Sequence, residues 1–353
     1  MSSPATGALL AKTLTSAAAL GFAPVAVRFN LFTIVANINR PATGEEVQVL
    51  YKSTHDATDA LPVIPCDTLF AMSGLGLVDL DREDLYSAND LTRHLAVSPS
   101  AAHGAIHFTT EALLAGAFLM SKLKSENFAY PFKDCETPVQ HAYQLIGKSE
   151  YIKKHAYSIM AAEGRMDSFN QFMEGKFFKP RKTPDRLQAL GYDFSAVARE
   201  AGPSTSTVMV DIGGGRGEML LELKEAFPQF TAADLVVEEF QSDNDLGDED
   251  SPQPVKGALV YHVAHILHNL PDLDAARLLQ RISDAMAPYL RLLMHEFSKN
   301  KNYAFIHASM VALYGGRERT SAEWQRMAAL AGFRITFEAY PELGEGVVEF
   351  RKI

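Results

Sequence analysis

The sequence predicts an α/β protein in which a doubly wound, mostly parallel sheet follows an N-terminal helical domain with a small β-wing. Three observations carry this prediction. Residues 208–227 have the pattern of a buried strand, a glycine turn and an amphipathic helix, the opening unit of a nucleotide-binding α/β sheet. Strands and helices alternate over residues 201–353, as in a parallel sheet covered on both faces. Residues 1–110 consist mainly of apolar helical segments.

The composition excludes several classes of function. The chain has 353 residues, 47% of them hydrophobic, enough to bury the cores of two domains. Its net charge of -10 argues against a nucleic-acid partner, because phosphate binding requires a basic surface. Cys66 and Cys135 cannot form a disulfide framework, so we expect a reduced, cytoplasmic protein. The apolar run 14–27 is short for a membrane span, and we expect a packing or dimer helix there and no membrane partner.

The first two regions of the chain are predicted to be helical. Residues 1–110 contain a helix over 8–20, and the start of the segment 77–95 alternates apolar and polar residues around an acidic turn, which predicts the β-wing. Residues 111–200 form a helical linker region. Within it, Phe169, Phe172 and Met173 have helical spacing, which is typical of buried core and equally compatible with a ligand cavity.

The glycine turn after the first sheet strand is the most informative stretch. Gly213, Gly215 and Gly217 follow the strand 208–212 in a G-x-G-x-G pattern. Glycine lets the backbone approach a ligand closely because no Cβ is in the way, and the following helix offers unpaired N–H groups. In the dinucleotide fingerprint G-x-G-x-x-G, a glycine would stand where Glu218 stands here. A turn of this kind can also join a strand to a helix without binding anything.

The remaining elements of residues 201–353 alternate along the chain. We expect strands at 230–234, 258–263 and 290–296, helices at 274–286 and 321–331, and a closing hairpin of 334–339 and 346–352. Asp234 would end the second strand, where an acidic side chain can hold ribose hydroxyls. Because ligands of open α/β sheets bind at the carboxyl ends of the strands, we expect the site there.

Three histidines, His262, His265 and His268, lie close together after the central strand. His265 and His268 could share a helix face and form a metal pair. No carboxylate or cysteine lies close enough in sequence to complete a ligand set, so we expect no metal site. An imidazole titrates near physiological pH, which suits a general base, although a histidine here can also be purely structural.

Taken together, these motifs resemble those of plant- and fungal-type O-methyltransferases that use S-adenosylmethionine (SAM), over roughly residues 25–350. The glycine turn resembles motif I of SAM-dependent methyltransferases, and Gly247-Asp248 matches a G-D-x-F motif of the family. The resemblance implies a Rossmann-like methyltransferase domain and SAM as the cofactor. It implies as cofactor contacts Asp211, Gly213, Gly215, Gly217, Asp234 and Asp248.

The catalytic residues are also implied by resemblance. The segment 267–272 is similar to the family motif L-H-D-W-x-D, whose histidine, the general base, matches His268. Two carboxylates hold that imidazole in the family, and they match Glu296 and Glu318, the latter within a G-G-x-E-R-T motif at 315–320. A carboxylate against a histidine fixes its tautomer and stabilises the imidazolium. Each carboxylate taken alone is also compatible with a surface salt bridge.

The resemblance further implies the substrate side and the partners. The F-N-x-x-M pattern places Phe169 and Met173 in a helix of the region 111–200 that roofs the substrate cavity. Met310 also lies at a position near the substrate, and His307 stands before it where many members of the family have aspartate. The N-terminal region resembles a winged-helix dimerisation domain, which implies a homodimer. The expected function is SAM-dependent methylation of a hydroxyl on an aromatic or polyketide-type small molecule in secondary metabolism.

Three departures from the family pattern keep other functions open. The segment between Asp234 and Asp248 is short and acidic. The pair 249–250 is Glu-Asp where apolar residues pack against adenine, which carboxylates cannot do. Asn269 follows the base where the family has aspartate. These departures suggest a reshaped SAM site. One alternative is a methyltransferase-like pericyclase that guides a cycloaddition or dehydration of a polyketide-derived substrate, and another is a non-catalytic relative.

Overall fold

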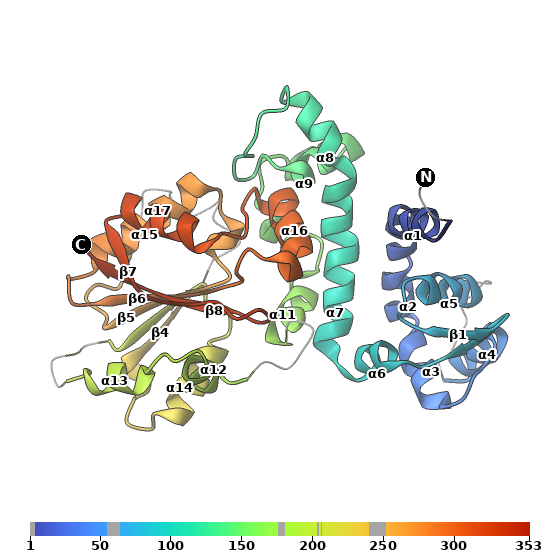
Figure 1. The fold of residues 1–353 in the computed structure, drawn as a ribbon, viewed down its shortest axis with the longest axis horizontal. Coiled ribbons are helices and arrows are strands. Elements are labelled where there is room, and N and C mark those ends of the chain that lie inside the picture. The colour runs from blue at the N-terminus through green and yellow to red at the C-terminus, as the bar shows by residue number, and fades with distance from the viewer. Residues whose placement is uncertain (1–3, 55–63, 176–180, 203–204, 206, 240–251) are drawn as a thin grey trace. The chain divides into compact units, whose positions relative to one another are not determined.

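The computed structural model describes residues 4–54, 64–175, 181–202, 205, 207–239 and 252–353 (Figure 1). The chain divides into two compact units. Unit 1 contains Met1–Leu114 and Arg165–Pro180, and unit 2 contains Ala115–Gly164 and Arg181–Ile353. The region 111–200, expected as a separate helical linker, is therefore shared between the two units. Among the described residues, no helix combines the length and the apolar character that crossing a membrane requires.

The described part of unit 1 is helical apart from one hairpin. Its elements are α1 (Pro4–Leu20), α2 (Ala23–Arg28), α3 (Leu31–Ile38), α4 (Gly44–Thr54), α5 (Ile64–Gly74), β1 (Asp79–Arg82), β2 (Leu85–Ser87), α6 (Asp90–Val97), α7 (Pro99–His107), the π-helix η1 (Phe108–Ala112), the start of α8 (Leu113–Ser125) and α11 (Met166–Gly175). The antiparallel pair β1–β2 confirms the predicted β-wing. Its tight turn uses Asp84 at φ 58°, a conformation that aspartate tolerates better than most residues.

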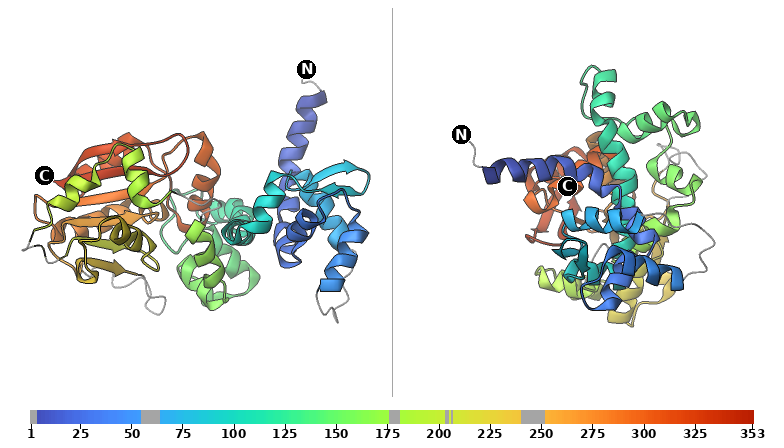
Figure 2. Two further views of the ribbon diagram at one scale, coloured as in Figure 1. Left: turned by 90° about the horizontal axis from the view of Figure 1, so that it is seen from below. Right: turned by 90° about the vertical axis from the view of Figure 1, so that its right-hand side faces the viewer.

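Helix α1 has an uncovered apolar face. Leu9, Leu10 and Leu14 are 67%, 59% and 70% exposed, and Figure 2 shows α1 extending away from the rest of unit 1. Unpartnered leucines on one helix are typical of a surface that meets another chain.

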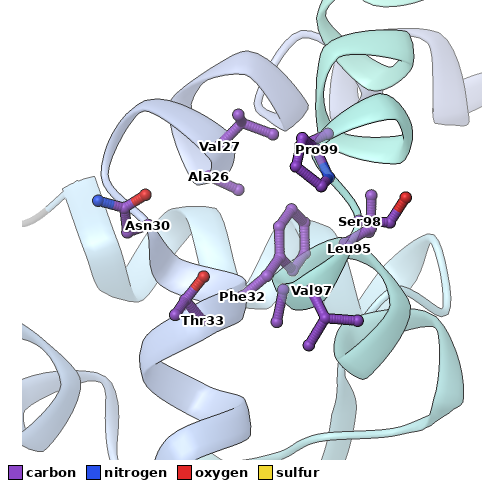
Figure 3. A pocket seen from close by; sticks show the side chains of 11 residues that line it. Ala26, Val27, Asn30, Phe32, Thr33, Leu95, Val97, Ser98 and Pro99 are labelled. Carbon is purple, nitrogen blue, oxygen red and sulfur yellow. The ribbon is translucent and has the colours of Figure 1, made fainter. Parts of the chain in front are cut away.

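A small pocket of about 160 Å³ lies between α2, α3 and the α6–α7 junction of unit 1 (Figure 3). Its walls are mainly apolar, with Phe32, Leu95 and Pro99 prominent, and the polar contributors are Asn30, Thr33 and Ser98. No side chain in this lining is an acid, a base or a thiol, so the pocket offers no group for catalysis.

Unit 2 is the sheet domain. Its helices are α8, α9 (Pro138–Ile146), η2 (Ser149–Tyr151), α10 (Ala156–Ala162), α12 (Thr183–Ala189), α13 (Phe194–Arg199), α14 (Glu218–Ala226), η3 (Ala232–Asp234), η4 (Leu267–Asn269), α15 (Asp272–Ala285), η5 (Lys301–Tyr303), α16 (Ala304–Tyr314) and α17 (Ser321–Leu330). Its strands are β3 (Met209–Ile212), β4 (Leu235–Glu238), β5 (Val260–Ala264), β6 (Arg291–Glu296), β7 (Phe333–Ala339) and β8 (Gly346–Lys352).

The sheet confirms the predicted fold class. Its order is β4-β3-β5-β6-β8-β7, with β4, β3, β5 and β6 parallel and the β7–β8 hairpin antiparallel at one edge. All six residues of β6 are buried, as expected for a central strand with helices on both faces. Figure 1 shows α15 and α17 on one face of the sheet and α12, α13 and α14 on the other.

The predicted second strand at 230–234 is wrong. Residues 232–234 form the short helix η3, and the strand β4 begins only at Leu235. The reason is local: the carboxylate of Asp234 accepts hydrogen bonds from the backbone N–H (2.6 Å) and the hydroxyl (2.8 Å) of Thr231, a side-chain cap that competes with strand pairing. Asp234 therefore precedes β4, and the acidic residue that ends β4 is Glu238, opposite Ile212.

Candidate active site

The glycine turn has the backbone geometry that the sequence predicted. Gly213, Gly215 and Gly217 have φ values of 69°, 59° and 81°, a region that other residues rarely adopt. A Cβ on Gly213 would lie 2.5 Å from the side chain of Ile266. Helix α14 begins directly after the turn at Glu218, so its first N–H groups face the carboxyl ends of the strands. The turn can thus cradle a polar ligand with backbone groups.

An acidic side chain lies at this turn, but it is not Asp234. Glu239 immediately follows β4, and its Oε2 accepts a hydrogen bond of 2.5 Å from the backbone N–H of Gly215. The carbonyl of Glu238 accepts from Gly213 N–H at 2.7 Å, which fastens the end of β4 to the turn. The sequence carried a signal for this, because the apolar run Leu-Val-Val directly before Glu238 is a better strand than 230–234.

Asp211 lies beneath the turn and is engaged by a histidine. Its Oδ1 is 2.6 Å from His262 Nδ1, and His262 Nε2 is 2.7 Å from His295 Nδ1. An ionised Asp211 accepts from His262 Nδ1–H, so His262 Nε2 accepts in turn from His295 Nδ1–H. Burial lowers the pKa of His295 well below its usual value, so that ring is neutral. The chain of contacts joins β3, β5 and β6 below the ligand edge of the sheet.

His268 is held by the two carboxylates that the sequence singled out. It lies on η4, directly after β5, and its Nδ1 is 2.8 Å from Glu318 Oε1 and 3.6 Å from Glu296 Oε2. Glu296 ends β6, and its Oε1 accepts from the backbone N–H groups of Leu267 (2.9 Å) and His268 (3.2 Å). Both carboxylates are buried, as is the imidazole. Because Glu318 accepts from Nδ1–H, the lone pair of the ring is on Nε2.

The electrostatics of this group follow from its burial. Burial raises the pKa of Glu296 to about 7; His268 opposes this rise and the carboxylate of Glu318 adds to it. Two carboxylates and one imidazole in a buried space favour a state in which a cation or a proton lies between them. An imidazolium formed at His268 would be stabilised by the same charges.

The loop that carries His268 is locked by a residue that the sequence reasoning missed. Arg319 is fully buried and donates to the carbonyl oxygens of Leu267 (2.6 Å) and Leu270 (2.8 Å). Its other donors contact Asp272 Oδ1 at 2.8–3.0 Å, and its guanidinium stacks on Trp324 at 5.1 Å. A planar guanidinium with five donors suits this task, which a lysine could not perform in the same way. Arg319 follows Glu318 directly, so one segment orients both the ring and its backbone.

A second cluster supports the far side of the loop. Asn269 Nδ2 donates to the hydroxyl of Tyr157 at 2.9 Å and to the carbonyl of His265 at 3.0 Å. The ring of His155 packs against Tyr157 and Tyr314, with ring centroids 4.7 Å and 5.7 Å apart. Its Nδ1 accepts a hydrogen bond of 3.2 Å from the backbone N–H of Tyr157 and so caps α10. Asn269 stands where the family pattern has aspartate, and its side-chain amide makes two hydrogen bonds there.

This cluster predicts a pH-dependent stability. Burial lowers the pKa of His155 from 6.5 to about 4. Between these pH values the unfolded chain binds a proton at this residue and the folded protein does not. The unfolding free energy is therefore expected to fall between pH 6.5 and pH 4, by about 2 kcal/mol at about pH 5 from this residue. The variant His155→Asn keeps a capping side chain but lacks the imidazole. Its unfolding free energy, measured by urea unfolding near pH 7 and near pH 5, should therefore not show this fall. An unchanged pH slope in the variant would assign the acid sensitivity elsewhere.

The predicted substrate residues are divided between the units. Phe169 and Met173 lie on α11 in unit 1, where Phe169 packs edge-on against His107 at 5.1 Å. His307 and Met310 lie on α16 in unit 2, with Met310 buried and His307 half-buried. Burial lowers the pKa of His307, and its Nδ1 is enclosed with no hydrogen-bond partner among the residues that the structure describes. Asp248 and the acidic segment around it lie outside the described residues.

Known proteins are similar to this chain in sequence and in fold. A family model described as the O-methyltransferase domain matches residues 196–334. The chain is 46% identical over 362 residues to the O-methyltransferase bfoE of Aspergillus brasiliensis, an alignment that covers 99% of this chain and 97% of bfoE.

Two solved structures illustrate the similarity of fold. A complex of LepI with SAM matches with a TM-score of 0.77 at 18% identity, covering 100% of this chain and 90% of LepI. The mitomycin 7-O-methyltransferase MmcR matches with a TM-score of 0.70 at 20% identity, covering 99% and 98%. At these identities the structural matches establish the fold alone.

Proposed function

The chain belongs to the O-methyltransferase family, and from that premise we propose that it methylates a hydroxyl of an aromatic or polyketide-type small molecule with SAM as methyl donor. The observation that carries the proposal is the hydrogen bond between His268 Nδ1 and Glu318, which leaves the Nε2 lone pair to take a proton. His268 is the general base, Glu318 fixes its tautomer, and Glu296 holds the backbone of its loop.

SAM supplies an electrophilic methyl group on a sulfonium. His268 Nε2 takes the proton from the substrate hydroxyl, so that the oxygen becomes a stronger nucleophile as the methyl is transferred. Glu318 stabilises the positive imidazolium that results. Arg319 and Glu296 keep the His268 loop rigid, which preserves the alignment on which an in-line displacement depends.

The described residues fit SAM at the glycine turn. The positive φ values of Gly213, Gly215 and Gly217 leave an open backbone that a Cβ would obstruct, and α14 presents N–H groups beside it. Glu239 is our candidate for the ribose hydroxyls, because a carboxylate after the second strand suits that role. Asp211, just before the turn, is held in place by its hydrogen bond with His262. Asp248 remains a proposed contact in the segment outside the described residues.

The acidic residue that holds the ribose can be identified by a pair of variants. Glu239→Gln is expected to weaken SAM and S-adenosylhomocysteine binding about 10- to 100-fold, since hydrogen bonds to a charged group contribute about 1.5–3 kcal/mol. Asp234→Asn is the matched control, because Asp234 caps η3 at the other end of β4 and should leave both dissociation constants unchanged. Calorimetric titration measures them. The reverse result would restore Asp234 to the ribose position.

The substrate side and the assembly are parts of the same proposal. Phe169, Met173, His307 and Met310 are our candidates for substrate contacts, because they occupy positions that lie near the substrate in the family, although His307 stands where many members have aspartate. A homodimer is supported by the exposed leucines of α1. A cytoplasmic location is supported by Cys66 and Cys135, neither of which is in a disulfide in the described part of the chain.

The function is tested by binding followed by turnover. Purified protein should bind SAM and S-adenosylhomocysteine in calorimetry and should transfer a methyl group to members of a panel of phenolic polyketides, detected by mass spectrometry. SAM binding without transfer to any phenol would shift the proposal toward a methyltransferase-like pericyclase, which is tested by incubating the protein with polyketide-derived dienes. Failure to bind either nucleoside would overturn the methyltransferase proposal.

A further inference from the structure

The structure completes a ligand set that the sequence neighbourhood lacks. We propose that His265, His268 and Glu296 form a binding site for a borderline-soft divalent metal ion such as Zn²⁺, and that an ion bound there inhibits methyl transfer. The second half of this statement rests on the proposed role of His268 as the base. The three side chains are buried, and one ligand atom from each lies within 4.8 Å of the others.

The distances suit a small metal ion. Glu296 Oε2 is 3.9 Å from His265 Nδ1 and 3.6 Å from His268 Nδ1. Ligand atoms of a tetrahedral zinc site with bonds of about 2.0–2.1 Å lie roughly 3.3–3.4 Å apart. Glu296 Oε2 therefore needs to approach the two histidines by only a few tenths of an ångström, and the two imidazole nitrogens, within 4.8 Å of each other, must also close on the ion. Two imidazole nitrogens and one carboxylate oxygen favour Zn²⁺ and its neighbours over Ca²⁺ or Mg²⁺, which prefer oxygen ligands.

The hydrogen bonds around the set are arranged as they are around bound metals. His265 Nε2 lies 2.7 Å from Glu345 Oε1, and Glu345 Oε2 lies 2.9 Å from Arg186. An ionised Glu345 accepts from Nε2–H, which directs the lone pair of His265 Nδ1 toward Glu296. A carboxylate that orients a metal-ligating histidine in this way is a general feature of zinc sites.

Glu296 Oε2 is a buried acceptor that faces the lone pair of His265 Nδ1. Glu296 is 1% exposed, and among the described residues its Oε2 has no hydrogen-bond partner, although Oε1 accepts two backbone N–H groups. Two acceptors directed at the same buried space favour either a proton on Glu296 or a cation between them. Glu318 adds a further carboxylate, because its Oε1 contacts His268 Nδ1 and its Oε2 is enclosed without a hydrogen-bond partner in the part of the chain that the structure describes.

Metal binding and catalysis would compete for the same ring. Coordination uses the lone pair of His268 Nδ1, so the neutral ring then carries its proton on Nε2. That nitrogen can no longer accept a proton from the substrate, and the hydrogen bond from Nδ1–H to Glu318 is lost. An occupied site therefore holds the enzyme in an inactive state until the ion is removed.

The proposal is tested with the full-length protein and Co²⁺ or Zn²⁺ alone. Co²⁺ should produce the intense visible absorption of a tetrahedral site, and Zn²⁺ should displace it. His265→Asn, which tolerates the φ of 55° at this position, should bind Zn²⁺ at least about 100-fold more weakly. Glu345→Gln should weaken binding about 10- to 100-fold and serves if the first variant does not fold. His94→Asn, at an exposed position, is the matched control.

The activity assay separates the two proposals. Zn²⁺ should lower methyl transfer by wild-type protein at least about 10-fold, with recovery on adding a chelator, whereas His265→Asn should stay active and insensitive. Absence of the Co²⁺ spectrum, or equal binding by wild type and by both ligand-side variants, would overturn the metal site whether or not the protein transfers methyl groups. Binding without inhibition of an active enzyme would overturn the competition with His268.

Discussion

Replacing His268 with alanine is expected to lower kcat for methyl transfer by about 10²- to 10⁴-fold, the range that a positioned general base contributes. The reason is geometric: Glu318 holds Nδ1 at 2.8 Å, so Nε2 is the atom left to accept the substrate proton. SAM affinity should be unchanged, because the proposed cofactor contacts lie at the glycine turn and not on η4. Turnover assays and calorimetry on the same preparation measure the two quantities.

The control for this variant is His94→Ala, which removes an exposed histidine from α6 and should leave kcat unchanged. Glu318→Gln is expected to lose less than His268→Ala, because the amide still contacts the ring but cannot stabilise the imidazolium as a charge does. Full activity in His268→Ala would remove the base assignment. Loss of activity accompanied by loss of SAM binding would point to a collapsed site instead.

Gly316→Ala is expected to lower kcat about 10²-fold and to destabilise the protein by about 1–3 kcal/mol or more. A Cβ at Gly316 would lie 2.1 Å from the carbonyl oxygen of His268 and 2.4 Å from the carbonyl carbon of Asn269. Neither contact involves a flexible side chain, so the backbone that carries the base must move. A displacement of about 1 Å in a catalytic group is enough for a loss of this size.

The matched control is Gly116→Ala on α8, where an added Cβ meets nothing within 4 Å. That change should raise the unfolding free energy by roughly 0.5–1 kcal/mol, since alanine is the better helix former, and should leave kcat alone. Urea unfolding and steady-state kinetics are measured for both variants. A Gly316→Ala protein with wild-type kcat would show that the approach of 315–320 to the His268 loop does not position the base.

The family and the chemistry of the candidate site were predictable because they depend on short local patterns. The glycine turn, the segment around His268 and the Gly-Gly-Arg-Glu-Arg-Thr run each have a characteristic spacing. The alternation of buried strands and amphipathic helices then predicts a sheet whose carboxyl edge gathers these motifs. The hydrogen bond between His268 and Glu318 joins residues 50 positions apart, and motif resemblance alone suggested it.

The second strand shows where local patterns failed. Residues 230–234 contain a mixture of apolar and polar side chains, and the cap between Asp234 and Thr231 turned them into a helical turn. In the structure the strand is instead Leu235–Glu238, so Glu239 lies at the glycine turn where Asp234 was predicted. A side-chain hydrogen bond to the local backbone, here from Thr231 N–H to Asp234, competes with strand pairing.

The sequence by itself determined the fold class, the glycine turn, the β-wing and the residue types of the candidate site, because these follow from periodicity and from motifs of a few residues. Only the tertiary structure decided which acidic residue meets the turn, how Arg319 locks the His268 loop, and that Glu296 lies beside both His265 and His268. The physical reason is that these contacts join separate strands and loops. Parallel pairing and helix packing set their distances, and no local pattern encodes them.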